Sequence, residues 1–209
     1  MTTRSKTLTR AAIILGFAIL FAMPAWTAAD DGQEGQRIVF SMNAQHVGTG
    51  GGGMTPLTIV VNRWSSMDEA DALEEILATQ GMQALADALR SAQEVGFIRA
   101  PSIGTTGWRL RYAQMYRGPE EGTRIIHIAT DRPIDFEEAF TRQAGGNWAW
   151  DYNVTFIEMT VDNEGNGEGV LGVGVEFRYD EENDTLTMAS VSSQPIRLNG
   201  ITMRIEGGN

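Results

Sequence analysis

The 209-residue chain contains no cysteine, and Lys6 is its only lysine. The missing thiols exclude disulfide bonds, cysteine nucleophiles and cysteine-ligated metals. The missing lysines exclude a Schiff base anywhere beyond position 6. Histidine is almost as scarce, with His46 and His127 as the only two. Several common kinds of enzyme chemistry are therefore closed to this protein.

The first 29 residues have the pattern of a secretory signal peptide. A basic segment with three positive charges, residues 4–10, precedes the continuous apolar run Ala11–Met23. Small residues at positions 27–29 then offer a cleavage site that leaves Asp30 as the new N-terminus. The apolar run is shorter than the roughly 20 residues of a spanning helix, which favours a cleaved signal over a permanent anchor. We expect a secreted or periplasmic protein with no stable membrane insertion after cleavage.

Acidic residues outnumber basic ones. The chain has 16 Lys and Arg against 27 Asp and Glu, a formal charge of −11, and loss of residues 1–29 removes three basic and no acidic residues, leaving −14. Because this charge repels phosphate groups, we expect neither nucleic acid nor anionic lipid as a partner. The partners left open are another protein and a small ligand.

Residues 30–209 are expected to form one mainly β domain. Leu171, Val173, Val175, Phe177 and Tyr179 alternate with small or charged residues, which predicts one strand with a single buried face. About nine strands in all are predicted, and they favour an antiparallel sandwich or a partly closed barrel. The region 152–205 should be a continuous meander. The other predicted strands are residues 37–43, 57–64, 97–100, 108–116, 123–130, 153–161, 185–191 and 196–205.

Two changes of phase predict irregular strands. Val154 and Phe156 share a face, but the apolar set of Ile157–Val161 is one residue out of phase with them. A β-bulge at the Phe156–Ile157 step would reconcile the two sets. A second change of phase falls at Asn199-Gly200.

A short helix pair is predicted between the early strands. Ser66 and Glu69 have the spacing of a capping box, and apolar residues at helical spacing run from there to Gly81. A second short helix follows and stops before Gly96. Each helix has one apolar stripe, so we expect both to lie on the sheet. A third short helix is predicted at residues 135–143.

One acidic loop is a candidate calcium site, the only cofactor that the sequence brings into consideration. Asp162, Glu164 and Asn166 place oxygen ligands at alternate positions of this loop. A helix-flanked calcium loop has a bidentate Glu at its twelfth position, which here is Val173, and strands flank this loop instead of helices. The alternative is a solvated hairpin loop.

Three residues are candidate ligand contacts. Trp148 and Trp150 alternate with Tyr152, so if exposed they would form a stacking platform for a sugar ring or an apolar ligand. Buried, they would belong to the core, as we expect for Tyr152. Arg132 could hold an anionic ligand, or it could support its turn by pairing with a carboxylate.

No catalytic residue is assigned. His127 could act as a general base oriented by Asp131. However, four residues of extended chain place these two side chains more than about 10 Å apart. No Gly-x-Ser-x-Gly motif accompanies them.

Four segments carry a resemblance to known proteins: Pro56–Ser65, Thr130–Ile134, Gly165–Gly169 and Gln194–Leu198. Over most of the chain after residue 29, the sequence resembles an uncharacterised group of secreted bacterial β-rich proteins. The resemblance implies a secreted or periplasmic location and brings no activity with it.

Three functions follow as hypotheses. The first is a non-enzymatic secreted or periplasmic domain that binds a protein or a ligand through a groove or a sheet edge. The second is a hydrolase that acts on envelope or extracellular polymers. The third is a small barrel that carries an apolar ligand.

The export hypothesis makes a prediction about the protein's mass. Expressed with its full sequence in a Gram-negative host, the protein should be recovered without residues 1–29, because the signal is cleaved before Asp30. Intact-mass spectrometry of the purified protein checks this. Recovery of the uncleaved chain from the membrane fraction would contradict it.

Overall fold

The computed structural model describes most of the chain after residue 35. The predicted signal peptide, the predicted helix at 135–143 and the aromatic residues Trp148, Trp150 and Tyr152 lie outside the described residues. The described ranges are residues 36–48, 51–100, 107–132, 134, 154–180, 185–191 and 195–207.

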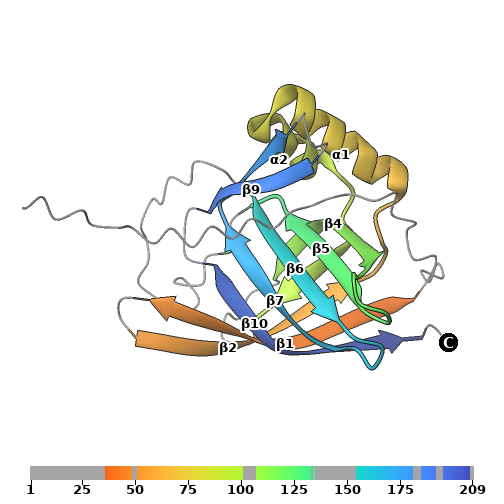
Figure 1. Cartoon of the computed structure of the whole chain (residues 1–209), viewed down its shortest axis with the longest axis vertical. Helices are drawn as coiled ribbons and strands as arrows, with labels where there is room; N and C mark the ends of the chain where they lie inside the picture. The colour runs from red at the N-terminus through yellow and green to blue at the C-terminus, as the bar shows by residue number, and fades with distance from the viewer. Residues whose placement is uncertain are drawn as a thin grey trace, which may run out of the picture.

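Eight antiparallel strands close into a barrel (Figure 1). The prediction of a mainly β, antiparallel fold is confirmed. Of the two predicted architectures, a sandwich or a partly closed barrel, the structure shows the barrel, and the barrel is closed. The barrel closes because β1 pairs with β10 on one side and with β2 on the other. In order around the wall the strands are β1 (Arg37–Gly48), β10 (Ile196–Glu206), β7 (Asn166–Val173), β6 (Thr155–Val161), β5 (Arg124–Thr130), β4 (Trp108–Arg117), β3 (Gly96–Arg99) and β2 (Gly51–Val61).

The barrel interior is packed with apolar side chains. Phe40, Ile59, Ile126, Ile157 and Leu171 are all fully buried there. All eight barrel strands contribute to this cluster. An eight-stranded barrel can be filled by its own side chains or can hold one small ligand, and here apolar side chains from every barrel strand pack in the interior.

Two helices follow β2 and precede β3, as predicted. They are α1 (Met67–Gln80) and α2 (Met82–Ser91). The capping box is present: Ser66 Oγ accepts the Glu69 amide at 3.2 Å, and Glu69 Oε2 accepts the Ser66 amide at 2.8 Å. Gly81, at φ 82°, separates the helices. In the described part of the chain, neither helix is long and apolar enough to cross a membrane.

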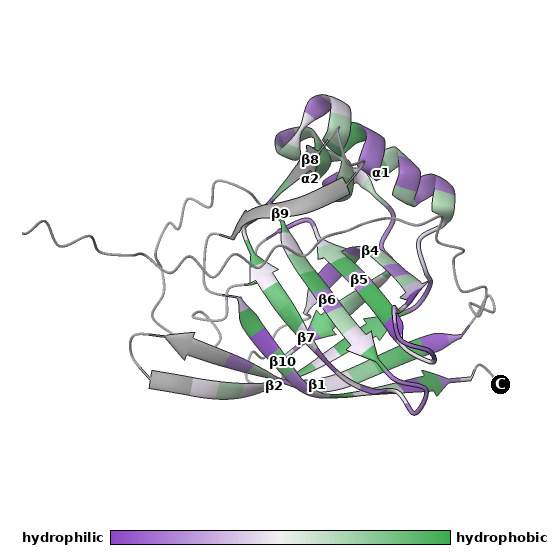
Figure 2. Ribbon diagram, viewed as in Figure 1, coloured by the Kyte–Doolittle hydropathy of each residue, from purple (hydrophilic) through white to green (hydrophobic). Residues whose placement is uncertain are grey.

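The helix pair covers the outside of the barrel wall. Leu77 and Leu89 pack in a second apolar cluster with Ala129 of β5 and Phe156 of β6. Figure 2 shows hydrophilic residues on the visible surface of α1 and apolar residues along the strands below it. The expectation that the helices lie on the sheet is therefore confirmed.

The predicted bulge at Phe156–Ile157 is wrong. β6 pairs with both neighbours in unbroken register over its whole length. Ile157 and Met159 face the barrel interior, whereas Val154 and Phe156 face the helices. Because both faces of β6 are buried here, apolar residues of both phases fit one regular strand.

The predicted irregularity at Asn199-Gly200 is confirmed. The register between β10 and both its neighbours shifts at this point. Gly200 has φ 61°, a conformation that glycine adopts without steric cost. The extra residue keeps the apolar side chains of β10 on the inner face on both sides of the bulge.

The long strand predicted through Leu171 and Tyr179 is in fact two strands. Gly174, at φ 63°, turns the chain out of the barrel wall between β7 and β8 (Val175–Asp180). Leu171 faces the barrel interior, but Phe177 belongs to the cluster under the helices. β8 pairs with β9 (Thr185–Val191) in a separate two-stranded sheet, and β10 pairs with β7. The predicted meander is therefore interrupted by a hairpin that leaves the barrel.

The capping box supports a prediction about stability. Ser66→Ala removes the acceptor for the Glu69 amide and should lower the free energy of unfolding by about 1 kcal/mol, measured by urea denaturation. Ser91→Ala is the matched control, because the Ser91 hydroxyl only donates back to the carbonyl of Asp87 at an exposed position. Its effect should stay within about 0.5 kcal/mol. Equal losses in the two variants would show that Ser66 has no capping role.

Candidate functional site

A pocket lies between the helix pair and the outer face of the barrel wall. The space open to the centres of water-sized molecules is about 90 Å³. One water needs roughly 10–15 Å³ by this measure, so the pocket has room for a small organic molecule. It is partly open to solvent. Thirteen of the described residues line it: Ala70, Leu73, Glu74, Leu77, Leu85, Leu89, Tyr112, Tyr116, His127, Ala129, Val154, Phe156 and Phe177.

The apolar part of the lining comes from stripes on the two helices. Leu73 and Leu77 are four residues apart on α1, and Leu85 and Leu89 are four apart on α2, so each pair shares one face of its helix. The two stripes meet the outward side chains of β5 and β6. The same burial that holds the helices on the barrel therefore builds the pocket wall.

A row of four rings crosses the pocket lining from β4 to β8. The centroids of Tyr116 and His127 are 5.2 Å apart, and those of His127 and Phe156 are also 5.2 Å apart. Phe156 and Phe177 meet edge to face at 5.1 Å. These distances lie in the range of favourable aromatic contacts.

Three polar groups on the outer face of β4 form a hydrogen-bonded triangle. Tyr112, Gln114 and Tyr116 alternate along the strand and so point to the same side. The Tyr112 hydroxyl lies 2.8 Å from both Gln114 Oε1 and the Tyr116 hydroxyl, and the Tyr116 hydroxyl donates to Gln114 Oε1 at 2.9 Å. Gln114 Nε2 donates to Met67 Sδ at 3.0 Å. The triangle is thereby tied to the first turn of α1.

Both phenols are held in the neutral form. Burial raises the pKa of Tyr112 well above its ordinary value, and the neighbouring Tyr116 and the charges of Glu74 and Asp71 raise it further. Burial is also the main cause that raises the pKa of Tyr116, against a lowering by the hydrogen bond with Tyr112. These groups therefore act as neutral hydrogen-bonding partners at physiological pH.

His127 has a carboxylate partner on the next strand. It is buried, and its Nε2 lies 3.2 Å from Glu158 Oε2. The two residues are directly opposite in the register between β5 and β6, and Gln114 is opposite His127 on β4. The outer wall thus carries a polar row of Gln114, His127 and Glu158 beside the aromatic row.

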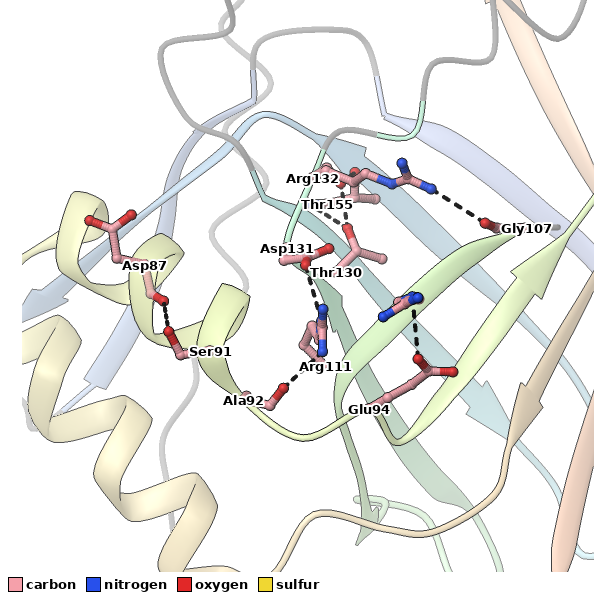
Figure 3. A network of polar contacts seen from close by, with 11 residues as sticks. Asp87, Ser91, Ala92, Glu94, Gly107, Arg111, Thr130, Asp131, Arg132 and Thr155 are labelled. Atoms are coloured by element: carbon pink, nitrogen blue, oxygen red, sulfur yellow. Dashed lines mark hydrogen bonds and ion pairs between the residues drawn. The ribbon is translucent and has the colours of Figure 1, made fainter. Parts of the chain in front are cut away.

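Asp131 does not orient His127. Its Oδ2 pairs with Arg111 Nε at 3.0 Å, and Arg111 Nη1 donates to the carbonyl of Ala92 at 2.9 Å (Figure 3). Ala92 is the C-cap of α2. A cation at a helix C-terminus is favoured by the helix dipole, so this pair fastens the end of α2 to the barrel.

Of the three sequence-predicted ligand residues, only Arg132 belongs to the described part of the chain, and it does not line the pocket. Arg132 is exposed and donates to the carbonyl of Gly107 at 3.3 Å (Figure 3), which supports the turn after β5. Its turn-supporting role thus involves a backbone carbonyl. Trp148 and Trp150 lie outside the described residues, so their predicted role stays a prediction.

The candidate calcium residues lie in the hairpin loop between β6 and β7. The Asp162 carboxylate accepts the Asn166 amide at 2.8 Å, and the Asp162 amide donates to the Asn166 carbonyl at 2.8 Å. Gly165, at φ 83°, allows the turn. In the described ranges of the chain, no three His, Asp or Glu side chains are grouped so that they could hold a metal ion. The loop geometry is that of a hairpin closed by its own side chain.

Sequence reasoning missed Tyr112, Tyr116 and Glu158. The sequence of β4 contained a clue to the tyrosines, because apolar or aromatic residues occupy both sets of alternate positions along the strand. Ala113 and Met115 face inward, and the tyrosines face outward. A strand of this kind is buried on both faces. The pairing of His127 with Glu158 had no such signal, because it depends on the register between strands that are about 30 residues apart in sequence.

The chain matches no family model, no curated protein and no solved structure. The candidate site therefore rests on the geometry of the pocket itself.

The raised pKa values of the two phenols predict a loss of stability at high pH. In the folded chain each phenol keeps its proton to a higher pH than in the unfolded chain, where its pKa is near 10.0. Their contribution is therefore fully present below pH 10 and is lost as the pH rises above it. The free energy of unfolding should fall by up to about 1.4 kcal/mol per pH unit for each group.

Urea denaturation of the native protein and of Tyr112→Phe between pH 8 and 11 checks this. The decline above pH 10 should be shallower in the variant, which has one such group fewer. Curves of equal steepness would show that Tyr112 does not contribute.

Proposed function

We propose that this protein is an exported, non-enzymatic binding protein whose ligand is a small molecule with an apolar body. Its binding site is the pocket between α1, α2 and the outer barrel wall. The single observation that carries the proposal is a partly open pocket with nine apolar side chains and four titratable ones in its lining. Mostly apolar cavities with a few placed polar groups are the usual form of small-molecule sites.

The position of the pocket distinguishes this proposal from a barrel that encloses its ligand. Side chains from all eight barrel strands pack in the interior. The pocket lies on the other side of the wall, where β5 and β6 present Ala129 and Phe156 to the helices. An apolar ligand is thus best accommodated outside the barrel.

The pocket also supports binding better than hydrolysis. In the described part of the chain, no serine or threonine is among the residues that line it. His127 has a carboxylate partner in Glu158, as a catalytic base would, but the neutral phenols of Tyr112 and Tyr116 are poor nucleophiles for it to activate. Among the described lining residues, a histidine with a carboxylate partner is present, but the serine or threonine nucleophile of a hydrolase is not.

Export is supported by the signal-peptide pattern of residues 1–29. Outside the cytoplasm a cysteine-free domain keeps its fold without dependence on redox conditions. The closed barrel and its packed core provide that stability.

Binding of 1-hexanol to the mature full chain tests the proposal. Hexanol is neutral, and its seven heavy atoms at about 0.6 kcal/mol each give a Kd on the order of 1 mM or tighter. NMR titration should show saturable shifts at backbone amides of the lining residues. Leu73→Trp should remove the binding, because the indole fills the pocket from the half-buried Leu73 position of α1.

Ile76→Trp is the matched control for this variant. Ile76 is half-buried on the same helix, and it does not line the pocket. It should bind hexanol like the native protein. Absence of hexanol binding to the native chain, or equal binding by Leu73→Trp, would overturn the proposal.

A further inference from the structure

We propose that the ligand of this pocket is a small organic cation, an amine with an apolar body. This inference rests on the proposed function and adds the chemical class of the ligand. Its basis is that the carboxylate, the phenol oxygens and the aromatic rings around the pocket are all arranged to receive positive charge.

The charged group of the lining is acidic. Glu74 of α1 lines the pocket, and no arginine or lysine is among the thirteen lining residues. Glu158 adds a second carboxylate, whose Oε2 lies 3.2 Å from His127 Nε2. Negative charge of this kind attracts an ammonium ion and repels a carboxylate.

The phenol triangle presents oxygens rather than protons. The two phenols have one proton each, and the contacts of the triangle place both protons on oxygens inside it. Because its proton is used inside the triangle, the Tyr112 hydroxyl meets a ligand as an acceptor and not as a donor. An ammonium group has only donors, so it complements this oxygen. A carboxylate has only acceptors.

The aromatic row supplies the third element. The rings of Tyr116, His127, Phe156 and Phe177 follow one another at centroid distances of 5.1–5.2 Å across the lining. A cation within about 6 Å of a phenyl or phenol ring is attracted by the negative face of the ring. The same rings offer the apolar contact that an alkyl or aryl body needs. Cation recognition and apolar burial thus use one surface.

Comparison of three probes with different head groups separates the contribution of the charged head group to binding from the contribution of the apolar body. Hexylammonium, 1-hexanol and hexanoate have six carbons each and differ in charge at pH 7. With the mature full chain at low ionic strength, hexylammonium should bind about five- to tenfold tighter than hexanol, and hexanoate should bind most weakly. The preference for hexylammonium should decrease in 0.5 M NaCl, because salt screens the exposed carboxylate of Glu74.

Glu74→Gln tests the charge of the lining directly. It should reduce the ratio of the hexanol Kd to the hexylammonium Kd by about two- to threefold, the modest effect expected for an exposed carboxylate. Glu75→Gln is the matched control, since Glu75 is the exposed neighbour of Glu74 on α1 and lies outside the lining. It makes the same change of net charge and should leave the ratio unchanged. Equal effects of the two variants would assign the preference to the net charge of the protein and overturn the inference.

The outcomes distinguish this inference from the proposed function. If hexanol binds and hexanoate binds as tightly as hexylammonium, the pocket is a ligand site but not a site for cations. If none of the three probes binds, the proposed function fails and the inference fails with it. Tighter binding of hexylammonium that depends on Glu74 supports both.

Discussion

The structure depends on the burial of both faces of the barrel wall at β4, β5 and β6. The inner side chains of these strands fill the barrel, and their outer side chains, such as Ala129 and Phe156, would be exposed apolar surface if nothing covered them. Such a surface favours a cover strongly, at about 25 cal/mol for each Å² of apolar area removed from water. The helix pair inserted between β2 and β3 is that cover. The pocket is the place where this cover does not meet the wall completely.

Two local features bring the cover into position. Gly81 allows α1 and α2 to follow each other closely, and Gly174 turns the chain out of the wall so that β8 lies against the helices. At the far end of α2, Arg111 joins the helix C-terminus to Asp131 of the turn after β5. The helices are thus held to the barrel by apolar packing along their length and by a half-buried ion pair at one end.

The polar groups in this wall are arranged by strand register. Gln114, His127 and Glu158 are neighbours on three adjacent strands, although 13 and 31 residues separate them in the sequence. Their outward direction is fixed by the same alternation that points Ile126 and Ile157 into the barrel. A shift of one residue in either strand pair would move the polar groups into the core. The packing of the barrel interior therefore also fixes the geometry of the candidate site.

The sequence by itself determined the β class, the helix pair with its Ser66–Glu69 cap and the bulge at Asn199-Gly200, because these depend on local periodicity and on single residues with strong conformational preferences. It did not determine which face each apolar residue occupies where both faces of a strand are buried. For this reason, prediction from the sequence wrongly gave a bulge in β6 and a single strand that continued through Gly174. Only the tertiary structure decided that Tyr112, Tyr116, His127 and Phe177 meet in one pocket. The physical reason is that closure of the barrel and the strand register join residues whose separation in sequence carries no information about their contact.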